Sequence, residues 1–316
     1  CVMVHSLAGG TGSGLGSHIL ELLRDEYPSS FILSAVVAPY FGGETPLQGY
    51  NASLSISWLQ KFSDGIMLFQ NDQLNENLSV ALSKSNSQKL DGRGRHRVSV
   101  TDINMYIASC LSSVFLPYTV PSYLSNDNTS QCIPFDFADF VTNVCPDPRA
   151  KFVEVSTWPF VKPVKQSKND HASWMDLTTQ LMTMAARYSK DEVILSSMSQ
   201  MIVRGDSDHF FASEMERVRT KLMKQQAHVS WNPFPVDFKI SSSPALPSRN
   251  VFKSLTLCSN RNSFVDCFRG LLESAQTKFA AKAYLHWYLR YGCDEGMFEE
   301  AFETISQIMD EYQDLR

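Results

Sequence analysis

The sequence predicts an α/β protein, and three features of its first seventy residues support that prediction. An apolar run at residues 2–7 is followed by the glycine-rich segment 8–14 and by an amphipathic run at residues 15–23. A short apolar run bounded by turn residues indicates a buried strand, and apolar residues at helical spacing indicate a helix. Further buried strands are predicted at residues 31–37 and 65–69. Strands that alternate with helices in this way favour a parallel sheet.

The glycine-rich segment has the composition of a phosphate-binding loop. Glycines permit positive φ and let the backbone approach a ligand without Cβ clashes. Thr11 and Ser13 can donate hydroxyl hydrogen bonds at the start of a helix, where backbone amides attract anions. The candidate phosphate-binding residues are Gly9, Gly10, Thr11, Gly12, Ser13 and Gly14. The alternative is a glycine-rich turn without a ligand.

Two common nucleotide motifs do not fit this segment. A Walker loop needs Gly-Lys-Ser/Thr at the helix start, whereas Leu15 and Gly16 follow Gly14. A dinucleotide fingerprint fails as well, because Ser17 stands where the third glycine is required. The broken spacing disfavours a dehydrogenase.

The composition describes a globular protein whose partners are proteins or small molecules. Its 316 residues, 43% of them hydrophobic, are enough for two or three domains. A net charge of −5 argues against a nucleic-acid partner, and no apolar run reaches the length of a membrane span. Seven cysteines without a Cys-x-x-Cys pair predict reduced core thiols and a cytosolic compartment. Because the chain opens inside a strand pattern without a methionine, we expect it to be a fragment.

Gly-Gly-Thr-Gly-Ser-Gly resembles the phosphate-loop signature of the tubulin superfamily. Residues 46–54, 136–149 and 279–288 resemble three further stretches of the same superfamily, so the resemblance covers the whole chain. It implies a Rossmann-like GTPase domain present in part, a long central helix, an α+β intermediate domain and a C-terminal helical hairpin. The corresponding boundaries are residues 1–98, 99–118, 119–270 and 271–316.

The resemblance also implies roles for individual residues. Glu44 and Thr45 fall near the ribose of a bound GTP or GDP, and Asn71 and Asn104 match the two asparagines that read guanine. Asp139 matches the carboxylate with which one subunit positions the attacking water in its neighbour's site, and a carboxylate can do this chemistry. The alternatives are a solvated loop acid for Glu44, a plain surface residue for Asn104 and a carboxylate that complements a helix dipole for Asp139.

Two positions depart from the family pattern. Gln48 stands where alpha- and beta-tubulins have a glutamate, which implies an altered sugar contact. Val100 stands where the family has an aromatic residue that stacks on guanine, which implies that this stacking is lost or supplied elsewhere.

The rest of the chain predicts further elements. Residues 99–102 resemble a capping box and predict a helix that begins there and is stopped by Pro117. The basic stretch 84–97 reads as a charged surface insertion, and residues 161–170 as a polar loop at the place of the family's lateral contacts. His286 and Trp287 are expected to pack rather than to catalyse. Other strands are expected at residues 152–155, 193–203, 229–240 and 252–257, and helices at residues 175–184, 210–223 and around 298–309.

Within the superfamily, residues 5–16, 102–104, 113–115 and Asp139 look most like the delta branch, which is associated with centrioles, basal bodies and cilia. This resemblance implies a cytoplasmic, cytoskeletal protein whose partners are other tubulins or centriolar proteins. A possible GTPase activity would be completed across a subunit interface, with Mg²⁺ held by residues outside this sequence. The alternatives are a structural centriole component without turnover, or another divergent, epsilon-like tubulin.

Overall fold

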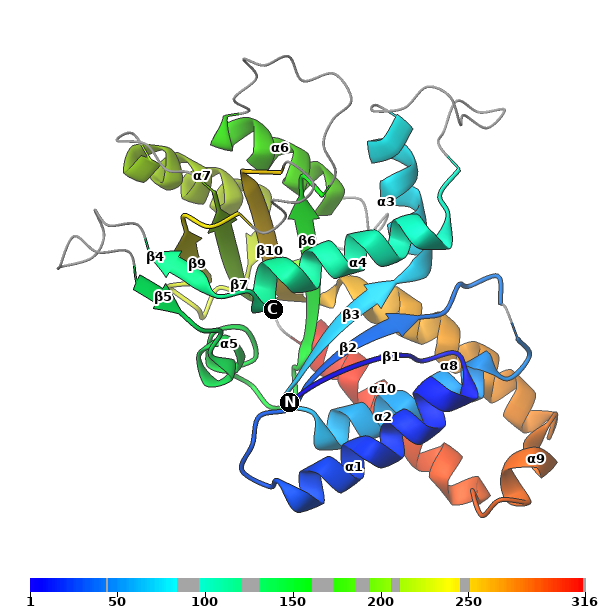
Figure 1. The fold of residues 1–316 in the computed structure, drawn as a ribbon. Coiled ribbons are helices and arrows are strands. Elements are labelled where there is room, and N and C mark those ends of the chain that lie inside the picture. The colour runs from blue at the N-terminus through cyan, green and yellow to red at the C-terminus, as the bar shows by residue number, and fades with distance from the viewer. Residues whose placement is uncertain are drawn as a thin grey trace. The chain divides into compact units, whose positions relative to one another are not determined.

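A computed structural model describes residues 1–43, 45–83, 97–120, 131–160, 173–185, 194–205, 211–244 and 251–314. It is a mixed α/β structure with a parallel sheet, as the sequence predicts (Figure 1). The chain forms two compact units. The first comprises Cys1–Asp72, Phe137–Val153 and Asn260–Arg316, and the second Gln73–Asp136 and Glu154–Ser259.

The first unit is built on three parallel strands. β1 (Val2–Ser6), β2 (Leu33–Ala38) and β3 (Gly65–Gln70) lie side by side in that order, and the start of β6 (Phe152–Trp158) pairs with β3. Val37 is in register with both Ser6 and Phe69, so the carboxyl ends of the three parallel strands lie together at one end of the sheet. The helices are a π-helical turn (Thr11–Leu15), α1 (Gly16–Glu26), α2 (Gln48–Phe62), α5 (Phe137–Val144), a 3₁₀ turn (Asn262–Phe264), α8 (Val265–Ala280), α9 (Leu285–Leu289) and α10 (Glu295–Gln313).

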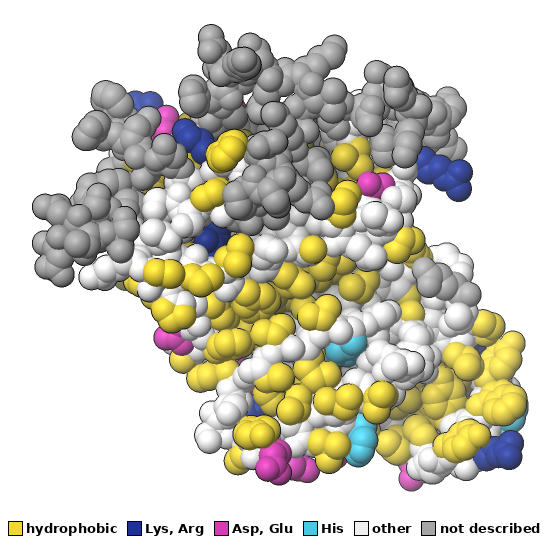
Figure 2. All heavy atoms as spheres, in the orientation of Figure 1, with side chains coloured by type: hydrophobic (Ala, Val, Ile, Leu, Met, Phe, Trp, Pro, Cys, Tyr) yellow, Lys and Arg dark blue, Asp and Glu magenta, His cyan; other side chains and the backbone are white. Residues whose placement is uncertain are grey.

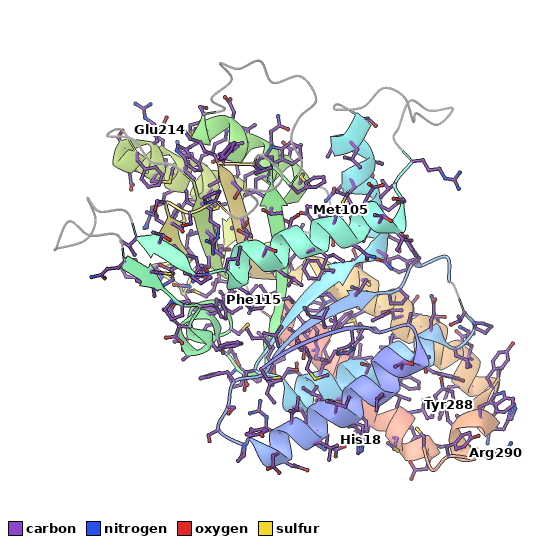
Figure 3. All side chains as sticks on the ribbon, in the orientation of Figure 1. His18, Met105, Phe115, Glu214, Tyr288 and Arg290 are labelled. Carbon is purple, nitrogen blue, oxygen red and sulfur yellow. The ribbon has the colours of Figure 1, made fainter. Side chains whose placement is uncertain are left out.

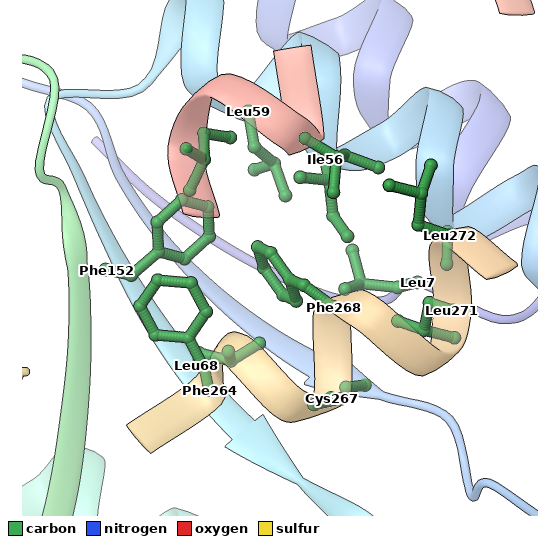
Figure 4. Packing of buried hydrophobic residues seen from close by; sticks show 14 of the residues in the cluster. Leu7, Ile56, Leu59, Leu68, Phe152, Phe264, Cys267, Phe268, Leu271 and Leu272 are labelled. Atoms are coloured by element: carbon green, nitrogen blue, oxygen red, sulfur yellow. The ribbon is translucent and has the colours of Figure 1, made fainter. Parts of the chain in front are cut away.

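A hydrophobic core joins the sheet of the first unit to helices α2, α8 and α10, which also pack against one another. Figure 4 shows Phe268 at its centre, close to Leu7, Leu68 and Phe152. The Phe152 and Phe268 rings meet edge to face, with centroids 5.1 Å apart. Because each fully buried Leu or Phe contributes about 1.5–3 kcal/mol, this cluster accounts for much of the unit's stability.

The second unit combines a mixed set of strands with four helices among its described residues. β6 is followed across the sheet by β10, β7 and β8, and β9 pairs with β7 in parallel; β4 and β5 form a separate antiparallel pair. The strands are β4 (Tyr118–Val120), β5 (Gln131–Ile133), β7 (Leu195–Arg204), β8 (Ala227–His228), β9 (Val236–Ser241) and β10 (Ser254–Arg261). The helices are α3 (Asn71–Ser83), α4 (Val100–Phe115), α6 (Trp174–Ala185) and α7 (Phe211–Gln225).

Helix α4 has defined ends. The Ser99 side chain accepts from the Asp102 N–H at 3.2 Å, and the Asp102 carboxylate accepts from the Ser99 N–H at 2.9 Å, which confirms the predicted capping box. At the other end, the fully buried Arg204 donates to the carbonyls of Ser113 at 2.8 Å, of Pro117 at 3.0 Å and of Leu116. These carbonyls lack intrahelical donors, so Arg204 satisfies the helix end and complements its dipole.

Most predicted elements appear within a few residues of their expected positions, with two exceptions. In the predicted strand region 229–240 a strand forms only at its end, as β9, and the short β8 precedes the region at residues 227–228. The expected packing of His286 and Trp287 is wrong, because both are exposed and Trp287 keeps 50% of its surface. The predicted loop 161–170 and residues 84–96 of the basic stretch lie outside the described residues.

The cysteines and the surface complete the description. All seven cysteines are free thiols, and Cys110, Cys145, Cys258 and Cys267 are buried, as predicted. Among the described helices, none combines the length and apolar character needed to cross a membrane. Apolar side chains nevertheless reach the surface at many places in Figure 2.

Candidate functional site

The glycine segment connects β1 to α1 and is itself partly helical. Beyond the end of β1 the Leu7 N–H still donates to the Val37 carbonyl at 3.0 Å. The π-helical turn then begins at Thr11 and runs directly into α1, whereas the sequence predicted a loop as far as Gly14. The first backbone amides of a helix lack intrahelical acceptors. Because the helical turn starts inside the glycine segment, the backbone amides without intrahelical acceptors are those of the glycine segment itself.

The four glycines of this segment have two different roles. A Cβ atom at Gly9, Gly10 or Gly14 would meet no atom within 4 Å, so the backbone is open at these positions. At Gly12 a Cβ would lie 2.4 Å from the Ser6 carbonyl oxygen. Positive φ does not explain these glycines, because none of the four has it, and that part of the prediction is wrong. Gly12 is required by the close packing of the helix start on β1.

The two hydroxyls of the segment also differ. The buried Ser13 donates its hydroxyl to the Gly9 carbonyl at 2.7 Å, and its N–H donates to the same oxygen at 3.0 Å. Ser13 therefore holds the segment in shape and offers a ligand only its hydroxyl lone pairs. Thr11 is exposed and is the hydroxyl directed to solvent.

The same edge of the sheet carries two more predicted site residues. Asn71 directly follows β3, is half-buried and begins α3. The next residue, Asp72, accepts the Phe41 N–H at 2.7 Å, which holds the start of the 41–48 loop beside the start of α3. Thr45 in this loop is exposed, and Glu44 lies outside the described residues. The structure thus brings together the segments that follow β1, β2 and β3.

Gln48, at the end of this loop, faces the protein. It is only 7% exposed, and its side-chain amide donates to the Tyr40 carbonyl at 2.9 Å. This bond supports the loop in which Gly43 adopts a φ of 76°, a value that favours glycine. Part of the Gln48 amide is thus used within the loop, and the predicted change in sugar contact at this position stays a prediction.

Sequence reasoning missed two residues that hold the glycine segment. The Asn51 side chain in α2 donates to the Ala8 carbonyl at 2.9 Å, and the hydroxyl of Tyr288, labelled in Figure 3, donates from α9 to the side-chain oxygen Oδ1 of Asn51 at 2.7 Å. Asn51 lies in a stretch that the sequence singled out by resemblance. No sequence signal indicated Tyr288, which lies 237 residues away along the chain.

Asn104 belongs to the second unit. It is exposed near the start of α4, one turn after Val100, which is 69% exposed. Its predicted role in reading a base stays a prediction, since the two units are described separately.

Asp139 lies near the amino-terminal ends of the first unit's strands, at the end of the sheet opposite to the glycine segment. It stands in the first turn of α5, where the Asn143 amide donates to it at 3.0 Å. A Cβ at Gly65, the first residue of β3, would lie 3.9 Å from Val141 of α5. Because the glycine segment lies beyond the last residues of the strands, β3 separates it from α5. β3 has six residues, and at about 3.3 Å per residue it spans roughly 17 Å.

Comparisons with known proteins identify relatives of this chain. Residues 1–79 match the Tubulin/FtsZ family, GTPase domain. The human tubulin delta chain is 27% identical over 340 residues, which cover 99% of this chain and 70% of the relative. The mouse tubulin delta chain is 25% identical with the same coverage. The tubulin beta-1 chain of Hypocrea rufa is 28% identical over 318 residues, 98% of this chain and 65% of the relative. Delta and beta chains thus match at similar identity.

Proposed function

We propose that this chain, whose residues 1–79 match the GTPase domain of the Tubulin/FtsZ family, binds GTP and GDP as a tubulin-like cytoskeletal protein. The proposal is carried by the meeting of the glycine segment, the 41–48 loop and Asn71 at one edge of a parallel sheet. In open sheets of this kind ligands bind beyond the carboxyl ends of the strands.

The glycine segment fits the phosphate groups. Gly9, Gly10 and Gly14 leave their backbone open, and the amides at the start of a helix attract negative charge. Thr11 supplies an exposed hydroxyl, and Glu44 and Thr45 are proposed to lie near the ribose. Among the described residues no three His, Cys, Asp or Glu side chains cluster, so none is assigned to Mg²⁺.

Asn71 and Asn104 are proposed to read the base. A side-chain amide donates and accepts at once, which suits the mixed hydrogen-bonding edge of guanine. A pocket built for a polar edge rejects bases that leave its groups unpaired, so ATP should compete poorly. Asn71 is supported by its place beyond β3, and Asn104 by the resemblance alone.

Assembly with other tubulins is the proposed setting of any hydrolysis. Asp139 and the glycine segment lie at opposite ends of the strands of one sheet. Stacked subunits could therefore present Asp139 of one subunit to the nucleotide of the next subunit. The cellular role proposed is that of the delta branch, in centrioles, basal bodies and cilia. The matches to delta chains support it, and the similar identity of beta chains keeps another branch as the alternative. A structural component that binds nucleotide without turnover is the second candidate.

A binding experiment on the full-length protein tests the nucleotide site. Gly10→Val places a bulky side chain in open space, so we expect it to weaken GDP binding about tenfold or more without unfolding the chain. Gly296→Val in α10 is the matched control and should bind normally. Titration calorimetry measures the affinity and circular dichroism the fold. Unchanged affinity in Gly10→Val contradicts the phosphate site, and equal competition by ATP and GTP contradicts the guanine preference.

A further inference from the structure

Two side chains connect the glycine segment to the C-terminal helices of the first unit. The amide of Asn51 bridges the Ala8 carbonyl, at 2.9 Å, and the Tyr288 hydroxyl, at 2.7 Å. Turning this amide over would place its oxygen against the Ala8 carbonyl oxygen, which repels it. Both bonds together therefore fix the orientation of the amide.

Tyr288 is held firmly by its neighbours. Its ring meets Tyr50 edge to face at 5.5 Å and Phe298 at 5.2 Å, and Tyr50 in turn donates its hydroxyl to the Ala283 carbonyl at 3.1 Å. Burial raises the pKa of Tyr288, so its hydroxyl stays protonated and donates at physiological pH.

The turn before α9 makes these contacts informative. Lys282 and Tyr284 have φ values of 51° and 60°, a region that side chains other than glycine rarely adopt. Such strain persists where surrounding contacts over-determine the backbone. The position of α9 is therefore set by its contacts with α2 and α10. Through its hydrogen bond to Asn51, the Tyr288 hydroxyl makes the orientation of the Asn51 amide depend on that position.

The bond to Ala8 has a direct consequence for the phosphate side of the segment. A peptide unit is planar and trans, so the N–H of Gly9 points opposite to the carbonyl of Ala8. Asn51 holds that carbonyl toward α2, which directs the Gly9 N–H away from α2. Among the described residues no acceptor receives this N–H. Its direction is thus set from the far side of the peptide.

We propose that Tyr288 and Asn51 are positioning residues for the glycine segment, and that they couple α9 to nucleotide affinity. The coupling rests on the proposed nucleotide function, whereas the positioning of the segment does not. Coupling between two sites is reciprocal. A change at α9 alters the segment, and a nucleotide on the segment stabilises α9. Trp287 in α9 is 50% exposed, and Tyr291, two residues after its end, is 80% exposed.

Hydrogen exchange on the full chain without nucleotide tests the positioning. Tyr288→Phe keeps the ring and removes only the hydroxyl, so the melting temperature should change little. We expect faster exchange of the amides of residues 9–14 in this variant. Tyr291→Phe makes the same chemical change on an exposed residue of the same region and should exchange like the unmutated chain. Equal exchange in all three proteins overturns the proposal.

Titration with GDP tests the coupling. Losing one hydrogen bond corresponds to about a two- to tenfold weaker affinity, which we expect for Tyr288→Phe but not for Tyr291→Phe. Adding Asn51→Ala to Tyr288→Phe should cost no more than Asn51→Ala alone, because both changes break one chain of bonds. GDP should also slow the exchange of α9 in the unmutated chain and not in Tyr288→Phe.

If the unmutated chain binds GDP and Tyr288→Phe binds it equally, the coupling is wrong and the nucleotide site stands. If the unmutated chain does not bind GDP, the proposed function and the coupling are both wrong, and the exchange of residues 9–14 still decides the positioning.

Discussion

Two glycines of the same segment should respond to alanine in opposite directions. Gly12→Ala places a Cβ 2.4 Å from the Ser6 carbonyl, and because backbone cannot yield cheaply we expect a loss of about 1–3 kcal/mol in unfolding free energy. Gly14→Ala meets nothing within 4 Å inside a helical turn, so we expect a gain of up to about 1 kcal/mol. Urea denaturation followed by circular dichroism measures both.

The comparison is controlled by its own pairing, because the two substitutions are chemically identical and two residues apart. A stability loss in both variants would contradict the open environment of Gly14. A neutral Gly12→Ala would contradict the close packing of the helix start on β1.

At the residue scale, local interactions were predictable and distant ones were not. The capping box of Ser99 and Asp102 involves residues three apart, so its pattern is visible in the sequence. The bond between Asn51 and Tyr288 depends on where two helices meet, which no local pattern contains. Ser13 was predicted to donate a hydrogen bond to a ligand. In the helical turn that forms, its hydroxyl donates to the Gly9 carbonyl instead.

At the scale of single elements, β1 should make stability depend on pH. Burial lowers the pKa of His5 in β1 below the ordinary 6.5, and a Cβ at Gly16 would lie 3.4 Å from its ring. Below pH 6.5 the His5 imidazole is protonated in the unfolded chain but stays neutral in the folded chain until the pH reaches its lowered pKa. The unfolding free energy should therefore fall as the pH drops from about 7 through 6.5 toward the lowered value in the folded state.

Urea denaturation between pH 5.5 and 8 measures this dependence. His5→Gln should flatten the slope, and His228 of β8, whose pKa burial also lowers, should leave a smaller slope of the same sign. His18→Gln, at an exposed histidine of α1, is the matched control. If His5→Gln keeps the full slope, the burial of His5 is not its cause.

Helix α1 shows what periodicity can and cannot predict about an element. The spacing of its apolar residues predicted a helix, and a helix is present. Leu15, Ile19 and Leu22 are nevertheless 53%, 39% and 52% exposed, while Gly16, Ser17 and Leu20 are buried. A hydrophobic pattern identifies a face of a helix, but the neighbours that cover a face are set by tertiary structure.

At the scale of the whole molecule, the units are assembled from segments far apart in the sequence. The first unit joins residues from the start, middle and end of the chain, and β6 and β10 each run across a boundary between units. The order of strands and helices was predictable from alternating patterns. Which segments gather into one core was not, because Phe152 and Phe268 look like any buried aromatic residues in the sequence. The four predicted domains stay a prediction.

The placement of Asp139 leads to a prediction about assembly. Since α5 and the glycine segment lie at opposite ends of the strands, a nucleotide bound at the glycine segment as proposed would be out of reach of the same subunit's Asp139. We expect slow GTP hydrolysis by the isolated full-length protein and faster hydrolysis with partner tubulins. Asp139→Asn keeps the shape of the side chain and removes its charge. Assembly should survive, while the rate in the assembled state falls roughly a hundredfold or more, the contribution of one positioned acid-base group.

The matched control is Asp136→Asn, which removes an exposed carboxylate one residue before α5. Phosphate release measures hydrolysis, and sedimentation measures assembly. Both variants lose one negative charge, so a general electrostatic effect on assembly would affect them alike, whereas water positioning affects only Asp139→Asn. If Asp139→Asn assembles and hydrolyses GTP at the unmutated rate, Asp139 only complements the dipole of α5. The hydrogen bond from the Asn143 amide would then only hold Asp139 at the start of α5. The non-hydrolysing structural component becomes the better description of this protein.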